Sequence, residues 1–387
     1  MIRKSVLTFS LLLLQASVGY AQRPPVSTVR AQADSEVRPT PSKPFELKWQ
    51  AIISGQNYAD QQEASELALF RLGLDATYRF SRDVWFKADG LIQSATGRVQ
   101  STFEDETEVE NFLLREATLN VRAFRVLRLS AGAISQNALG APTLVSGQRS
   151  FPGAEEALTF SNRWAQLEIS ARQTIPTSTT FANQSTEMES TPTFFNETIQ
   201  LKLKPHPYII LGGHVTHWAF ADLSKSTAAD SARFGNTVTP VQGNLSEFLY
   251  EYSGLEAGGY GHARLSKYFR VKAGGSFMQN NEAPEGLNQG QVLFGEVELR
   301  NLIPGVSIVP RYESIINQAD VSPAVFADGD YGYNNRQGQL VRLGLDFYKM
   351  GFKLEAAYYD GRTIEDSSIQ SDNQYFFINF STRPRQI

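Results

Sequence analysis

Four histidines are the residues whose type most directly suggests a metal site, and they are His206, His214, His217 and His262. His214 and His217 are three residues apart and follow an apolar, glycine-containing run that favours a strand. Side chains three apart on a strand point to opposite faces, whereas on a helix they could share a metal. We therefore predict that this pair binds no metal.

The run Asp328-Gly329-Asp330, followed by Asn334 and Asn335, offers oxygen ligands of the kind that calcium prefers. Its ligand spacing does not fit a calcium-binding loop, so a polar turn is the favoured interpretation. The sequence contains no nucleophile elbow, phosphate-binding loop or dinucleotide fingerprint. It also has no cysteine, which excludes a disulfide scaffold, a cysteine-based zinc site and a cysteine nucleophile. We expect no catalytic residue, no metal and no cofactor, and so no enzyme.

The composition narrows the class of protein further. The chain has 387 residues, 41% hydrophobic and 20% charged, with a formal net charge of -4. This mildly acidic balance argues against a partner nucleic acid. Past residue 14, no apolar run approaches the ~18–20 residues of a membrane-spanning helix. The length suits two average domains or one large β structure.

Residues 1–21 have the features of a signal peptide. A basic start at 3–4 is followed by an apolar core over 6–14 and by a small-x-small cleavage site at 19–21, before Gln22. The alternative is a buried N-terminal helix. We predict export from the cytoplasm, with cleavage before Gln22.

Residues 22–44 are rich in proline and polar side chains, which predicts a disordered periplasmic segment. From Phe45 onward the hydrophobic pattern has the period of two that is typical of β-strands, most clearly over 70–80. The predicted strands cover 45–54, 66–80, 84–94, 112–123, 127–135, 155–162, 164–173, 194–204, 208–219, 248–265, 269–279, 291–300, 306–315, 339–348, 352–359 and 374–382.

The predicted connections alternate between short turns and long polar loops. The long loops lie near 55–63, 95–110, 136–154, 174–192, 221–245, 280–289, 316–337 and 360–372. This asymmetry is typical of outer-membrane barrels, which have short periplasmic turns and long external loops. In hydrocarbon an open sheet edge would leave backbone groups unpaired, so such a sheet must close. The prediction is an all-β fold: a transmembrane antiparallel up-and-down β-barrel over 45–387, with about 16 strands.

In such a barrel the apolar side chains face lipid and the charged ones face the lumen. Aromatic residues beside the short turns, such as Tyr78, Phe80 and Tyr208, fit a girdle at the membrane–water interface. Alternation alone also fits a secreted soluble β protein, in which the apolar face would form the core. The signal peptide, the loop asymmetry and the aromatic residues together favour the barrel.

By this architecture the chain resembles a Gram-negative outer-membrane porin of the 16-stranded kind, over residues 45–387 and without a diagnostic motif. The final run 373–380 also resembles the signal read by the barrel-assembly machinery, but Tyr375 replaces its usual glycine and seven residues follow Phe380. The resemblance implies a passive channel in the bacterial outer membrane for small hydrophilic solutes or ions, with the lipid bilayer and further copies in a homotrimer as partners. A barrel with a blocked lumen and a structural or surface role is the alternative.

In such porins the third external loop folds into the lumen and narrows it, which points to residues 136–154 here. The apolar residues Leu139, Leu144 and Phe151 suit a loop that packs inside a barrel. We predict a constriction that selects by width and charge, formed by Arg149, Glu155 and Glu156 and facing the wall residues Arg71, Asp75, Asp89, Glu116 and Arg122. The alternative is that these are ordinary lumen or rim charges. Inward bases modestly outnumber inward acids, which predicts a weak anion preference.

Overall fold

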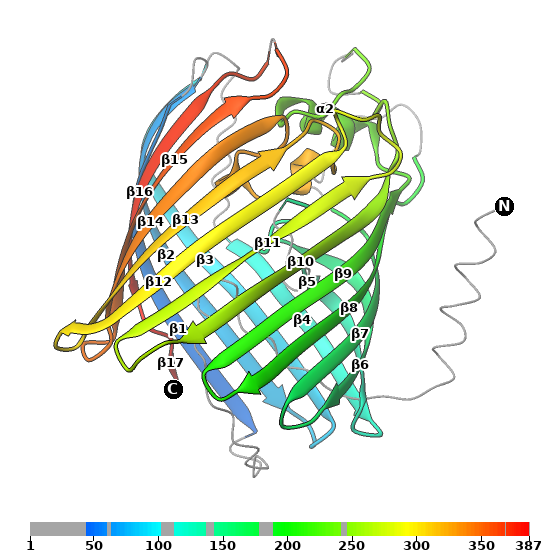
Figure 1. Ribbon diagram of the computed structural model, residues 1–387. Coiled ribbons are helices and arrows are strands. Elements are labelled where there is room, and N and C mark those ends of the chain that lie inside the picture. The colour runs from blue at the N-terminus through cyan, green and yellow to red at the C-terminus, as the bar shows by residue number, and fades with distance from the viewer. Residues whose placement is uncertain are drawn as a thin grey trace.

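The computed structural model describes residues 44–59, 63–101, 112–136, 143–177, 189–240, 246–367 and 369–386. The predicted signal peptide and all but the last residue of the proline-rich segment lie outside these residues. The described chain forms one antiparallel sheet of sixteen long strands, to which the two-residue strand β17 (Arg385–Gln386) adds a short extension. Figure 1 shows the strands tilted around a barrel, with short turns at one end and long loops at the other.

The sixteen strands follow one another around the barrel in sequence order. Their bounds are β1 (Phe45–Ala59), β2 (Glu63–Arg79), β3 (Val84–Ser101), β4 (Phe112–Ala123), β5 (Leu127–Ser135), β6 (Ser150–Ser161), β7 (Ala165–Thr174), β8 (Thr193–His206), β9 (Ile209–Ala221), β10 (Tyr252–Arg264), β11 (Phe269–Asn280), β12 (Gln289–Ile303), β13 (Val306–Asn317), β14 (Arg336–Phe347), β15 (Phe352–Thr363) and β16 (Asn373–Thr382).

The first and last strands of the barrel pair with each other and close it. Ile53 of β1 lies opposite Phe70 of β2 on one side and opposite Phe380 of β16 on the other. Closure gives the backbone groups of β1 and β16 partners on both sides, as a sheet in hydrocarbon requires. The predicted strand number and up-and-down topology are confirmed, and the predicted strands 112–123 and 127–135 coincide with β4 and β5.

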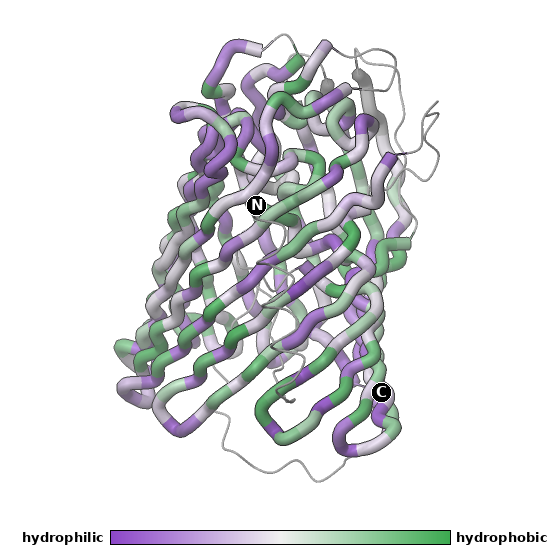
Figure 2. Tube along the Cα trace, turned by 90° about the vertical axis from the view of Figure 1, so that its right-hand side faces the viewer, coloured by the Kyte–Doolittle hydropathy of each residue, from purple (hydrophilic) through white to green (hydrophobic). Residues whose placement is uncertain are grey.

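Each strand alternates between an outer apolar face and an inner polar face, and Figure 2 shows this alternation along the chain. Ile53, Phe70 and Phe380 share the outer face and are 38–55% exposed. Arg71 and Asp75, on the intervening positions of β2, point to the other face. The exposed apolar face is the one that can contact acyl chains, because the long loops pack against the other one.

The first three strands are longer than predicted. Pairing between β2 and β3 continues to Glu63 opposite Ser101, so most of the predicted loop at 55–63 and part of that at 95–110 are strand instead. The hydrophobic period fades there because both faces of this hairpin are polar. The backbones of β2 and β3 continue to pair there without an apolar face. The hydrophobic pattern therefore did not reveal the extra length of these strands.

The long-loop end contains helix α2 (Lys225–Arg233) and the 3-10 helices η2 (Ala324–Phe326) and η3 (Gly329–Tyr331), with α2 beside the barrel mouth in Figure 1. Ser224 caps α2 by accepting a hydrogen bond from the Thr227 N–H at 3.1 Å. Among the described residues no helix combines the length and apolar character needed to cross a membrane.

Candidate channel lumen

A first cluster of charges lies on the inner face of β3 and β4. A β-bulge in β4 breaks the regular alternation, so that the adjacent residues Arg115 and Glu116 both reach inner-face partners. Arg115 Nη2 lies 2.8 Å from Asp89 Oδ1, and Lys87 Nζ lies 2.5 Å from Glu116 Oε2. The wall therefore presents two acid–base pairs side by side.

The charges continue onto β5, β6 and β7 around one buried carboxylate. Glu155 accepts hydrogen bonds from both Arg128 and Arg172, with Arg172 Nε 2.5 Å from Glu155 Oε2. The side chains of Glu155 and Arg172 are only 3% and 2% exposed. Ser130 and Asn120 extend this network toward β4, since Ser130 accepts from Arg128 and donates to Asn120. Glu155 thus neutralises two arginines that have little access to water.

A second chain of alternating charges runs along β12 to β15. Arg311 contacts Glu296 at 3.5 Å and Glu313 at 3.0 Å, and Arg342 contacts Glu313 at 3.0 Å and Glu355 at 3.6 Å. The Glu313 side chain is buried and also accepts a hydrogen bond from the Tyr331 hydroxyl at 3.0 Å. Because β5 and β13 are eight strands apart in a ring of sixteen, the two charged clusters occupy opposite walls.

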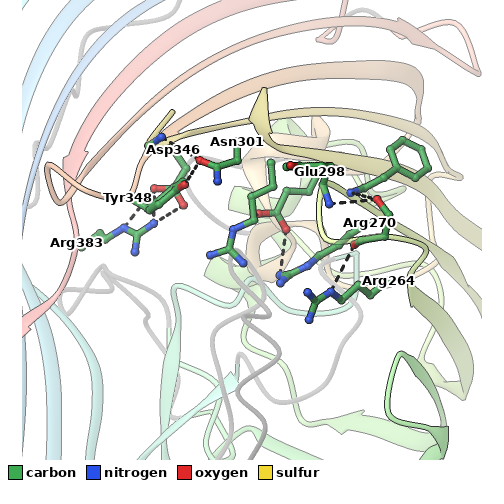
Figure 3. A network of polar contacts seen from close by, with 12 residues as sticks. Arg264, Arg270, Glu298, Asn301, Asp346, Tyr348 and Arg383 are labelled. Carbon is green, nitrogen blue, oxygen red and sulfur yellow. Dashed lines mark hydrogen bonds and ion pairs between the residues drawn. The ribbon is translucent and has the colours of Figure 1, made fainter. Parts of the chain in front are cut away.

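A third polar network lies near the short-turn end (Figure 3). Arg270 Nη1 lies 3.2 Å from Glu298 Oε2, and Arg383 Nη2 lies 2.5 Å from Asp346 Oδ2. Tyr348 donates a hydrogen bond to Asn301 across the neighbouring turns. This rim carries charges of both signs, as the two walls above it do.

The predicted constriction residues do not form one ring. Glu155 lies in the buried cluster with Arg128, and Asp89 and Glu116 lie in the first cluster. Asp75 is on the same inner face, opposite Asp89 and Lys48. Arg71 is also on that face and donates to Gln93 Oε1 at 3.1 Å.

Two further predicted residues lie at opposite ends of the barrel. Arg122 is at the short-turn end, 3.7 Å from Asp83 Oδ1. Arg149 is at the long-loop end, where its Nη2 donates to the Val325 carbonyl at 2.6 Å. The predicted constriction therefore separates into a wall group, one residue at the short-turn end and one residue among the loops at the mouth.

The structure corrects the placement of Glu156. Adjacent residues of a strand face opposite sides, and Glu155 faces inward. Glu156 lies opposite Leu129 and Ala171 on the outer apolar face, so it cannot line the lumen. Among the described residues it has no ion-pair partner within 4 Å. The prediction was wrong here because both acids were assigned to a loop-like entry into β6.

Replacing Glu156 by Leu should therefore stabilise the barrel by about 1 kcal/mol, because a carboxyl on the lipid face costs less than a basic group but is still unfavourable. Chemical unfolding in lipid vesicles measures the change. Glu197→Leu is the control, since Glu197 faces outward within 3.8 Å of His217 and has a partner to lose. A destabilised Glu156→Leu variant would place this carboxyl in a protein contact instead of lipid.

The histidines follow the predicted strand geometry. His214 faces inward, with Nε2 2.7 Å from Glu256 Oε2, whereas His217 faces outward beside Glu197. The Asn334 side chain donates to the Ala319 and Ser322 carbonyls, which is the role of a residue that organises a turn. The described residues contain no group of three or more His, Asp or Glu side chains able to hold a metal.

Sequence reasoning missed the inward folding of the loop after β13. Val321, Ala324 and Phe326 are buried against the barrel interior, although 316–337 was predicted as an external polar loop. Its apolar run Val321 to Phe326 was the available signal, comparable to that used for residues 136–154. For residues 136–154, burial of Leu144 and Val145 agrees with the predicted packing inside the barrel. Phe151 belongs instead to the inner face of β6, and Leu139 lies outside the described residues.

No family model and no curated protein matches the sequence. Solved structures with a similar fold include OprB of Pseudomonas putida, in a high-pH structure, with 10% identity over 87% of this chain and 93% of that one and a TM-score of 0.55. OmpT, an outer membrane protein of Vibrio cholerae, has 10% identity, coverage of 88% and 98%, and a TM-score of 0.52. OmpF of Salmonella typhi, in complex with daunomycin, has 8% identity, coverage of 89% and 97%, and a TM-score of 0.51. The chain is thus a porin-like β-barrel, a closed antiparallel sheet of sixteen long strands with the fold of bacterial outer-membrane proteins.

Proposed function

We propose that this protein is a porin of the bacterial outer membrane through which small hydrophilic solutes or ions diffuse passively. The observation that carries the proposal is the division of one closed sheet into an apolar outer face and a charged inner face. Barrels of about 16 strands are wide enough to leave an aqueous channel. The short turns then face the periplasm and the long loops face the outside.

The charged walls supply the selection. A solute that moves between the two clusters exchanges hydration water for contacts with fixed charges of both signs, and only solutes that fit between the walls pass. Glu155 is shared by Arg128 and Arg172, which leaves a local excess of positive charge on the wall of β5, β6 and β7. This excess supports a weak preference for anions.

Reconstitution in a planar bilayer tests the proposal. We expect discrete conductance steps and, in a salt gradient, a small reversal potential with the sign of anion preference. A reversal potential of the opposite sign would contradict the selectivity alone. A folded protein that inserts and never conducts would contradict the channel itself.

A barrel with a blocked lumen and a surface or structural role is the second candidate. The observation in its favour is the apolar cluster inside the barrel mouth, in which Leu144, Phe151 and Phe326 are almost fully buried. Such packing reduces the open cross-section. The bilayer measurement separates the two functions, because a blocked barrel inserts without conductance.

The proposal includes a route to the membrane. Residues 1–21 direct export and are removed before Gln22, residues 22–44 stay in the periplasm, and the barrel-assembly machinery inserts the barrel. Strand β16, which carries the predicted assembly signal, pairs with β1 in the closing seam, and this supports its role. A homotrimer belongs to the proposal by the same resemblance, and native mass spectrometry of the detergent-solubilised protein tests it.

A further inference from the structure

Three segments from the long-loop end pack together in the barrel mouth, and we call residues 143–149, 224–237 and 319–327 the cap. The Phe326 ring lies between Phe151 of β6 and Phe220 of β9, with centroid distances of 5.3 and 5.7 Å. Phe326 is fully buried. The segment 319–327 therefore covers the inner wall from β6 to β9 and occupies space that water would otherwise fill.

The segment 319–327 is tied to the segment 143–149. Ser322 Oγ donates to the Thr143 carbonyl at 2.8 Å, and the Ser146 N–H donates to the Phe326 carbonyl at 2.8 Å. These contacts join the loop after β5, which was predicted to narrow the lumen, to the loop after β13. The narrowing element is thus made of both loops.

Asp320 fixes the segment from the other side. Its carboxylate accepts hydrogen bonds from the Thr237 N–H at 2.9 Å, the Thr237 hydroxyl at 2.6 Å and the Tyr252 hydroxyl at 3.1 Å. Asp320 is fully buried and has no basic side chain within 4 Å among the described residues. A buried carboxylate held only by neutral donors is costly, so these hydrogen bonds must form together for the cap to close.

Asn236 reinforces this anchor through backbone groups. Its Nδ2 donates to the Ala319 carbonyl at 2.7 Å and the Ser322 carbonyl at 2.9 Å, and its Oδ1 accepts from the Ala324 N–H at 2.6 Å. A buried loop must satisfy its own backbone polar groups, and here a side chain from a neighbouring loop does so. The inward position of 319–327 is therefore specified by particular residues.

We propose that the segment 319–327, held by Asp320 and Asn236, sets the upper size of solute that can enter the barrel. The inference rests on the proposed function as a diffusion channel and adds the element that limits it. Releasing the anchor lets the segment leave the mouth and widens the entrance. The size limit then rises even though the charged walls are unchanged.

The anchor also predicts a pH dependence. Burial raises the pKa of Asp320 above its ordinary value, although the hydrogen bonds from Thr237 act in the opposite direction. A raised folded-state pKa means that the packed cap is most stable below the ordinary pKa and loses stability as pH rises through the raised one. Tyr252 is the titratable group in contact with Asp320, and Thr237, Asn236 and Asn280 are its neutral neighbours. Wild-type conductance should increase from acidic to neutral pH, and Asp320→Asn should flatten that increase.

The test compares Asp320→Ala with Glu285→Ala, which removes an exposed acid from the nearby loop between β11 and β12. Bilayer conductance and swelling of vesicles in sugars of increasing size are measured on protein that shows the heat-dependent gel shift of a folded barrel. We expect Asp320→Ala to raise conductance at least twofold and to admit larger sugars, with Glu285→Ala unchanged. If Asp320→Ala does not fold, Thr237→Val takes its place, with the same direction expected, because it removes the hydroxyl that donates to Asp320.

A disulfide provides the rescue, because the natural chain has no cysteine. Thr143→Cys and Ser322→Cys, combined with Asp320→Ala, should restore the wild-type size limit when oxidised and lose it when reduced. A folded Asp320→Ala variant with wild-type conductance and size limit overturns the inference. If the wild type does not conduct but Asp320→Ala does, the open-channel function is overturned and the inference stands. If neither protein conducts, both are overturned.

Discussion

Replacing Glu155 by Gln should destabilise the folded barrel by about 3–5 kcal/mol, the cost of removing one partner from a buried ion-pair network. Glu155 is shared by Arg128 and Arg172, whose side chains are 12% and 2% exposed, so the substitution leaves two guanidinium groups poorly solvated and without their common acid. Glutamine keeps the volume and can still accept a hydrogen bond. The loss of stability therefore measures the missing charge compensation and does not include the cost of a cavity.

The measurement is chemical unfolding in lipid vesicles, followed by the fluorescence of the four tryptophans. Glu247→Gln is the matched control, because the Glu247 side chain is 62% exposed and forms a surface ion pair with Lys225 at 3.0 Å. An exposed pair of this kind contributes about 0–1 kcal/mol. Equal unfolding midpoints for Glu155→Gln and the wild type would show that water already compensates both arginines.

The same variant reports on transport. Removing the shared acid adds one net positive charge to the wall of β5, β6 and β7, so the reversal potential of any Glu155→Gln protein that inserts should move toward stronger anion preference. This shift does not depend on the size of the stability loss. An unchanged reversal potential would place Glu155 outside the solute path.

The sequence predicted the barrel well because one physical constraint repeats in every strand. Lipid outside and water inside enforce an alternation that appears at Phe70 to Phe80 and again near the C-terminus at Phe376 to Phe380. The alternation is lost where β2 and β3 extend past the apolar band, and the predicted strands there were too short. Strand existence was therefore predictable, whereas strand length beyond the membrane was not.

The candidate site was less predictable because it depends on contacts between segments far apart in the chain. The wall residues Asp89 and Glu116 could be placed on the inner face by alternation. The pairing of Asp89 with Arg115 requires a bulge that the sequence pattern does not mark. The cap requires Asp320 and Thr237 to meet across 83 residues, and no local pattern encodes that contact. Glu156 shows the opposite error, since alternation alone sufficed to place it outside once the start of β6 was known.

Replacing Leu201 by Arg should cost about 2–4 kcal/mol, the penalty for a basic side chain at mid-depth on the lipid face of a barrel. Leu201 is outward and 41% exposed, between the polar Glu197 and the aromatic Tyr208 of the short-turn end. An arginine there has no water within reach except by extending toward the interface. Chemical unfolding in vesicles again gives the free energy.

Gln200→Arg supplies the control at the adjacent position. Gln200 lies opposite Glu168 and His214 on the inner face, so the added charge meets a polar wall and should change stability by less than about 1 kcal/mol. The two substituted positions are adjacent in sequence, but one side chain lies on the outer face of β8 and the other on its inner face. If Gln200→Arg were the costlier of the two, the apolar face of β8 would be packed against protein and the polar face would be the outside, which is the arrangement of a soluble β protein.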